Sequence, residues 1–180
     1  MIRLADPEGF ATWRARQLEH ARHELQKKGR LAPRAYILCR RDIETGEHHS
    51  DPMPVLARPS SFQGNAVFSR QLSEIARAGD AVASLFLAEA WALPATLSHE
   101  EWDAAIKECG GSARHSPLRV EEITSITEEV GRIRIDSARI TRCRKGKPIV
   151  APFVPCFDFA EWPPEVEGKF MKILPPRVLH

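Results

Sequence analysis

The sequence lacks the patterns that identify several common enzyme classes. It contains no GxSxG segment, no glycine-rich phosphate loop and no HExxH pair, which are typical of hydrolases, nucleotide-binding proteins and zinc proteases. Its four cysteines, Cys39, Cys109, Cys143 and Cys156, form no CxxC pair, so neither a structural zinc site nor a disulfide framework is indicated. We expect reduced thiols and no resident cofactor, while the question of enzymatic activity stays open.

Long apolar segments and a strong net charge are also missing. The longest apolar run, residues 81–93, is well short of the roughly 20 residues that a membrane-spanning helix needs. A formal net charge of +2 creates no global attraction to nucleic acids or anionic membranes. The first ten residues show no signal-peptide pattern, and arginine outnumbers lysine, a bias typical of GC-rich bacterial genomes. We therefore expect a cytoplasmic bacterial protein that does not bind membranes.

Length and composition predict a single domain with a tail. The 180 residues are 43% hydrophobic, which is enough for one core and short for two. After residue 157 the chain carries two pairs of adjacent prolines, which cannot extend a sheet. We predict one domain over residues 1–157, followed by a tail over residues 158–180 that packs on the domain or on a partner.

The apolar run 81–93 is predicted to be the central strand of the fold. It follows a Gly-Asp turn and is ended by a proline, although its periodicity alone would also allow a buried helix. In a strand, Leu85, Leu87 and Glu89 share one face and Phe86 lies on the other, so both faces need a cover. Glu89 must then pair with an arginine, reach water, or have a raised pKa and serve in a site.

Capping and apolar patterns predict the remaining elements. A helix begins at Pro7 and ends before Gly29, with Arg14 on its solvent-facing side. The other predicted elements are helices over 65–78 and 98–109 and strands over 35–39, 120–130, 132–136 and 148–157. Residues 120–130 also suit a helix, and a change of apolar phase at Ser137 indicates a β-bulge. Together these elements predict an α+β fold, with a mainly antiparallel sheet, a meander in its C-terminal half, and two or three helices packed on it.

The proline-rich segment 47–65 is predicted to be a long loop with an edge-strand portion. It contains His48, His49 and Asp51, the densest group of metal-ligating residues in the chain. One functional hypothesis is therefore a metal-assisted hydrolase, in which these three residues hold the ion and Glu89 acts as the general base.

A second hypothesis is nucleic-acid binding by the basic hairpin over residues 132–147. Its candidate contact residues are Arg132, Arg134, Arg139, Lys145 and Lys147. Neighbouring glutamates in 120–130 would neutralise some of these charges as cross-strand pairs, and the hairpin has few aromatic residues for base stacking.

Because catalytic motifs are missing and the sheet has few helices to cover it, the leading hypothesis is a non-enzymatic binding domain. Its partner would be another protein or a second copy of the chain, as in a homodimer. The hydrolase and the nucleic-acid binder remain as alternatives from other functional classes.

Overall fold

The computed structural model describes residues 3–60, 64–94, 96–159 and 172–174. Its α-helices are α1 (Pro7–Lys28), α2 (Asn65–Ala78) and α3 (His99–Glu108), with a short 3-10 helix η1 (Ala113–His115). Its strands are β1 (Arg34–Arg41), β2 (His48–Ala57), β3 (Ala81–Ala92), β4 (Val120–Glu129), β5 (Arg132–Thr141), β6 (Ile149–Val150) and β7 (Val154–Phe159). Among the described helices, none is long and apolar enough to cross a bilayer.

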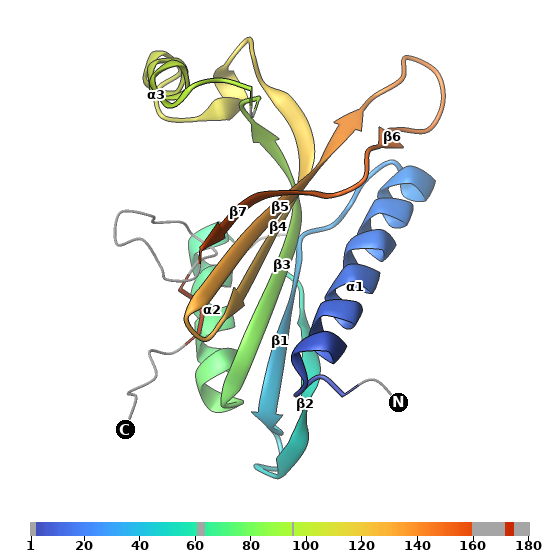
Figure 1. Ribbon diagram of the computed structural model, residues 1–180, viewed down its shortest axis with the longest axis vertical. Coiled ribbons are helices and arrows are strands. Elements are labelled where there is room, and N and C mark those ends of the chain that lie inside the picture. Colours follow the sequence, from blue (N-terminus) through green and yellow to red (C-terminus); the bar gives the residue numbers. More distant parts are fainter. Residues whose placement is uncertain (1–2, 61–63, 95, 160–171, 175–180) are drawn as a thin grey trace.

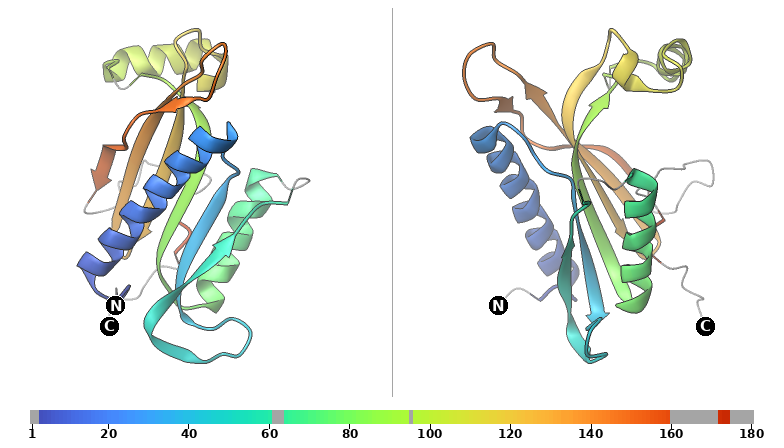
Figure 2. Two further views of the ribbon diagram at one scale, coloured as in Figure 1. Left: turned by 90° about the vertical axis from the view of Figure 1, so that its right-hand side faces the viewer. Right: turned by 180° about the vertical axis from the view of Figure 1, so that it is seen from behind.

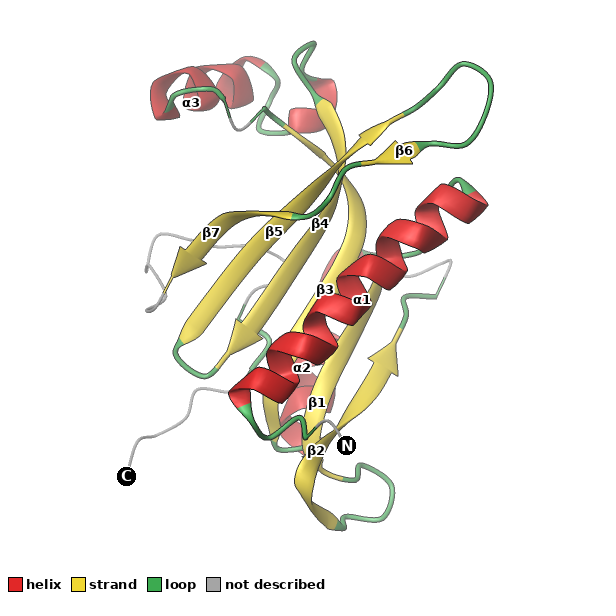
Figure 3. Cartoon of the chain, turned by 45° about the vertical axis from the view of Figure 1, so that its right-hand side comes forward, coloured by secondary structure: helices red, strands yellow, loops and turns green. Residues whose placement is uncertain are grey.

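The strands form one curled antiparallel sheet in the order β2-β1-β3-β4-β5-β6, and β7 also pairs with β5 (Figure 1). Helices α1 and α2 lie on opposite faces of this sheet (Figure 2). The predicted α+β class and the antiparallel meander are thus confirmed. Two helices cover the sheet, whereas α3 lies near one end of it, away from both (Figure 3).

Strand β3 occupies the interior position that its apolar run predicts, between β1 and β4. Leu85 and Leu87 are buried on the α1 side, while Phe86 and Ala88 are buried on the α2 side. A strand that is covered on both faces needs apolar residues at successive positions, which explains why its sequence reads as a continuous apolar run.

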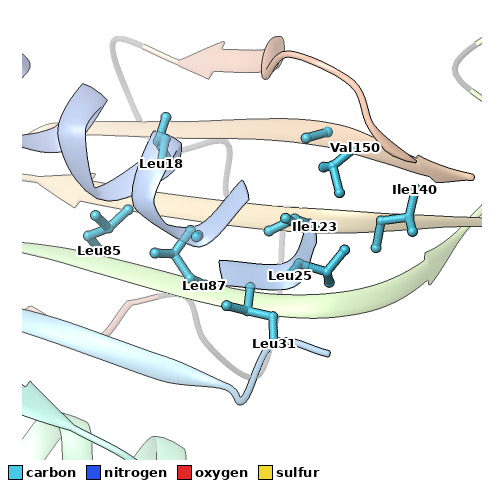
Figure 4. Packing of buried hydrophobic residues seen from close by; sticks show 10 residues of the cluster. Leu18, Leu25, Leu31, Leu85, Leu87, Ile123, Ile140 and Val150 are labelled. Carbon is cyan, nitrogen blue, oxygen red and sulfur yellow. The ribbon is translucent and has the colours of Figure 1, made fainter. Parts of the chain in front are cut away.

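Helix α1 begins with Pro7 at its first turn and ends at Gly29, which adopts a left-handed conformation (φ 77°) and donates its N–H to the carbonyl of Leu25. Leu18 and Leu25 pack against β3, β4, β5 and β6 on one face of the sheet (Figure 4). The predicted exposure of Arg14 is wrong, because its side chain points into the sheet and is buried.

The other predicted helices are confirmed. Helix α2 ends at Gly79, and α3 begins with the predicted capping box, in which the Ser98 hydroxyl accepts the N–H of Glu101 and the Glu101 carboxylate accepts the N–H of Ser98. The strand interpretation of 120–130 is also confirmed, since β4 pairs with β3 along ten residues.

The C-terminal strands differ in detail from the prediction. The β4–β5 register is unbroken through Ser137, so the predicted bulge in β5 is wrong. The irregularity lies in β7, where Cys156 is the extra residue opposite Ile135 and Asp136. Asp136, Ala138 and Ile140 lie on the same face of β5, which α1 covers. The apolar pattern of the sequence is interrupted there because Asp136 binds the buried Arg14, while Ala138 and Ile140 belong to the apolar core.

The segment predicted as one strand over 148–157 forms β6 and β7, separated by residues 151–153. Strand β7 continues to residue 159, beyond the predicted domain boundary. The proline pairs of the tail lie outside the described residues. Within the tail, Ile173 is buried in the core between α2 and the sheet.

Candidate functional site

The predicted metal ligands lie in a strand rather than in a loop. His48, His49 and Asp51 belong to β2, an outer strand of the sheet, beside a shallow hollow that Leu4 and residues 48–54 line. Neighbouring residues of a strand point to opposite faces, so the two imidazoles diverge. Among the described residues, no group of three or more His, Cys, Asp and Glu side chains is arranged to hold a metal ion.

Each of these side chains has a different surrounding. Arg41 Nε donates to His48 Nε2 at 3.2 Å, and the backbone N–H of Ala5 donates to an oxygen of Asp51 at 2.7 Å. The buried Nε2 of His49 has no hydrogen-bond partner within the described part of the chain. These contacts tie β2 to its neighbours and do not converge on a common point.

Glu89 lies near the opposite end of the sheet from the histidines. Strand β1 pairs with both β2 and β3. His48 of β2 lies opposite Arg41, at one end of β1, whereas Leu87 of β3 lies opposite Arg34, at the other end. Glu89 follows Leu87 by two residues, so the length of β1 separates it from His48. At 3.3 Å per residue this length is roughly 20 Å, which is too far for a shared ligand. The structure therefore does not bring together the residues of the hydrolase hypothesis.

Both oxygens of Glu89 are already bound within the chain. One accepts the N–H of Leu31, and the other accepts Nη2 of Arg142 at 2.6 Å. Arg142 also binds Glu121 at 2.5 Å and the carbonyl of Gly29. Hydrogen bonding to Arg142 lowers the pKa of Glu121, and the bond to Glu121 raises the pKa of Arg142. This network joins the end of α1 to β3, β4 and β5, so Glu89 has a structural role.

The basic hairpin is divided between paired and exposed charges. Arg132 binds Asp158 through two nitrogens, at 2.8 and 2.6 Å, and lowers the pKa of Asp158, while Arg134 binds Asp136 at 3.1 Å. Three further predicted contact residues are exposed and form no ion pair with a described residue: Arg139, Lys145 and Lys147. Of the five residues predicted to contact nucleic acid, three therefore have charges that are available to bind phosphates.

Cys39 does not offer a nucleophile. It is buried under Gly79, and burial raises the pKa of its thiol to about 11. A thiolate is the reactive form, and such a pKa leaves about one thiol in a thousand ionised at a pH near 8.

Two exposed tryptophans and an exposed leucine lie in an arm that projects from the end of β3 and β4. We define the arm as residues 91–119 apart from residue 95; it contains α3 and η1 (Figure 1). Trp91, Trp102 and Leu118 are 43%, 42% and 50% exposed. Tryptophan is enriched at protein interfaces, so these side chains are candidates for contact with a partner.

Local contacts hold the Trp91 ring and the backbone at Leu118 in place. The guanidinium of Arg119 lies over the Trp91 ring at 5.1 Å, and the Arg119 side chain also donates to the carbonyl of Arg114 at 3.3 Å. The hydroxyl of Ser116 accepts the N–H of Leu118 at 3.1 Å and fixes the turn before β4. The Trp91 ring is therefore held in place before any partner binds, which lowers the entropic cost of burying it.

Sequence reasoning did not single out this arm. It predicted a helix over 98–109 between two strands and assigned no site to it. The available signal was the position of residues 94–119 as an insertion between two paired strands, which predicts a segment outside the core.

The fold and these surfaces define an α+β domain with a two-sided core and a projecting arm. Comparisons of the chain with protein-family models, with curated proteins and with solved structures found no match.

Proposed function

We propose that the protein is a binding domain that associates with a second copy of itself through the arm. The observation that carries this proposal is the exposure of Trp91, Trp102 and Leu118 on a segment outside the two-sided core. Tryptophan is enriched at the centres of protein interfaces, where burying its large surface contributes much of the binding free energy.

The charges of the arm favour a second copy as the partner. The described helix α3 carries four acidic residues and one lysine: Glu100, Glu101, Asp103, Glu108 and Lys107. Residues 112–119 contain Arg114, His115 and Arg119 and no acid. Opposite charges attract, so we place the acidic helix of one arm against the basic segment of the other. In a two-fold dimer this contact occurs twice.

The outer strand β2 offers a less suitable surface. It also exposes apolar side chains, Met53 and Leu56, but Pro52 and Pro54 lie between and beside them. A proline has no N–H to donate to an added strand, so these prolines protect the edge against pairing. Met53 and Leu56 therefore serve as a matched control for the arm.

Sedimentation velocity over about 1 to about 100 μM tests the proposal. The wild-type chain should form a dimer whose fraction rises with concentration, and the Trp91→Ala/Trp102→Ala variant should weaken it at least about tenfold, since removal of interface tryptophans costs about 2 kcal/mol or more. The Met53→Ala/Leu56→Ala variant, with side chains 53% and 47% exposed, should dimerise like the wild type. A wild-type monomer throughout, or equal loss in both variants, would refute the proposal.

A charge exchange tests the orientation of the two arms. Arg114→Glu should weaken the dimer, because it places an acid against the acidic α3 of the partner copy. Adding Glu100→Arg should restore part of the affinity, and both effects should shrink as salt screens the charges. A double variant no tighter than Arg114→Glu would exclude this arrangement of the arms.

Nucleic-acid binding is a second candidate, which the exposed Arg139, Lys145 and Lys147 favour. If these residues bind phosphates, the Lys145→Ala/Lys147→Ala variant should bind single-stranded RNA more weakly than the wild type, with a shallower dependence on salt concentration. Equal binding by the two chains, or a salt slope near zero, would remove this candidate.

A further inference from the structure

The carboxylate of Glu128 is buried in the sheet and bound by backbone amides. Glu128 lies on the α2 side of β4, opposite Ser84 of β3 and Ile133 of β5, and is 7% exposed. Its oxygens accept the N–H of Ile173 at 2.8 Å and of Leu174 at 3.3 Å. One carboxylate thus holds two successive amides of the segment 172–174.

The side chain of Ile173 fills an apolar site beside this carboxylate. Ile173 is 2% exposed and belongs to the same buried cluster as Phe68 and Leu72 of α2 and Phe86 of β3. Leu174 packs on the edge of the cluster. The site therefore recognises a pair of residues by two means, their amides and their apolar side chains.

The Glu128 site is costly to leave empty. Burial raises the pKa of Glu128, because the charged carboxylate is poorly solvated there, and the two amides oppose this effect. Without residues 173 and 174, the carboxylate would lose both of these donors and the apolar cluster would lose its Ile side chain. Lys172, the residue before the pair, has a φ of 58°, a conformation that a non-glycine residue keeps only when its surroundings impose it.

We propose that the Glu128 site is a peptide-binding site, filled here by the chain's own residues 172–174, which an Ile-Leu segment of another protein can occupy instead. The amide pair and the buried isoleucine are groups that any such segment supplies. In this mode of recognition the isoleucine side chain is the anchor in an apolar pocket, and hydrogen bonds from the main-chain amides to Glu128 support it. This site lies on the α2 side of the sheet, and the inference is independent of the arm.

Competition within the full-length chain tests this inference. The probe is a fluorescein-labelled peptide with the sequence of residues 169–176, followed by fluorescence anisotropy. The Ile173→Asp chain, whose own segment no longer fits the pocket, should bind the peptide at least about tenfold more tightly than the wild type. Adding Glu128→Ala to this variant should abolish the gain, and a control peptide with Asp in place of its Ile should not bind.

Any of three results would overturn the inference: equal binding by the wild-type and Ile173→Asp chains, no binding by either chain, or binding that survives Glu128→Ala.

Hydrogen exchange on the wild-type chain gives a second test that needs no substitution. The amides of Ile173 and Leu174 should exchange at least about tenfold faster than that of Phe86, because the segment leaves the site while β3 stays folded. Exchange of all three at one rate would show that the segment is a permanent part of the core.

Discussion

Arg14 is a charged residue that the protein keeps inside its core. Its Nε donates to the hydroxyl of Thr127 at 2.8 Å, and its Nη2 binds the buried carboxylate of Asp136, which Arg134 also contacts. Burial lowers the pKa of Arg14, and the nearby carboxylate of Asp136 opposes this effect. Such a pair adds little stability over an apolar pair, but loss of one partner leaves the other charge buried.

We therefore expect Arg14→Met to lower the free energy of unfolding by about 3 kcal/mol, because Asp136 keeps only the more exposed Arg134. The Arg14→Met/Asp136→Leu variant should recover most of this loss. Arg16 lies on the solvent side of the same helix, and Arg16→Met should change stability by less than about 0.5 kcal/mol. Urea denaturation measures all three, and an Arg14→Met chain within about 1 kcal/mol of the wild type would contradict the expected role.

The connection between α2 and β3 depends on close packing at Gly79. A Cβ atom at this position would lie 2.7 Å from the Cβ of Cys39 and closer still to its Sγ. The absence of a side chain lets the end of α2 rest on β1 just before the chain enters β3. The central strand is thus placed by contact between the helix end and the sheet as well as by its own apolar sequence.

Gly79→Ala should cost about 2 kcal/mol or more in thermal or urea unfolding, because the methyl group has no room beside Cys39. Gly64, at the start of the same helix, has open space around the corresponding position, and Gly64→Ala should cost at most about 1 kcal/mol. If both substitutions were equally mild, the packing at Gly79 would be looser than its contacts indicate.

The molecule as a whole has a well-covered centre and two different peripheries. Helices α1 and α2 shield the middle of the sheet from either side, whereas β2 forms an outer edge and the arm projects from one end. Pro52 and Pro54 protect the β2 edge, whereas Trp91 and Leu118 of the arm stay 43% and 50% exposed. Association should therefore occur at the arm and be suppressed at the β2 edge.

Replacing the exposed Pro54 by valine restores an N–H to the β2 edge and should allow strands of different molecules to pair. Light scattering during mild heating should show large aggregates for Pro54→Val but not for Pro59→Val, whose proline lies outside the strand. The Trp91→Ala/Trp102→Ala substitutions should not suppress these aggregates, since the edge and the arm are separate surfaces. Identical behaviour of the two proline variants would show that Pro54 does not protect the edge.

Much of the architecture was predictable because its signals are local. The apolar run of β3, the proline and glycine that bound α1, and the capping box at Ser98 each specify an element within a few residues. The candidate site was less predictable. His48, His49 and Asp51 are adjacent in sequence, but the geometry of β2 directs the two histidines apart, and Glu89 lies near the far end of β1.

Local signals in the chain were sufficient to predict the class of fold, the central strand and the extents of the helices, because backbone preferences and apolar periodicity act over short separations. Three features became visible only in the folded chain: Arg14 is buried, Glu89 is held by Arg142, and Glu128 binds the amides of Ile173 and Leu174. The partners in these contacts are 45 to 122 residues apart, and Arg14 is joined to Asp136 by the longest of these separations. A local pattern records that a residue is charged, whereas only the folded chain brings its partner to it.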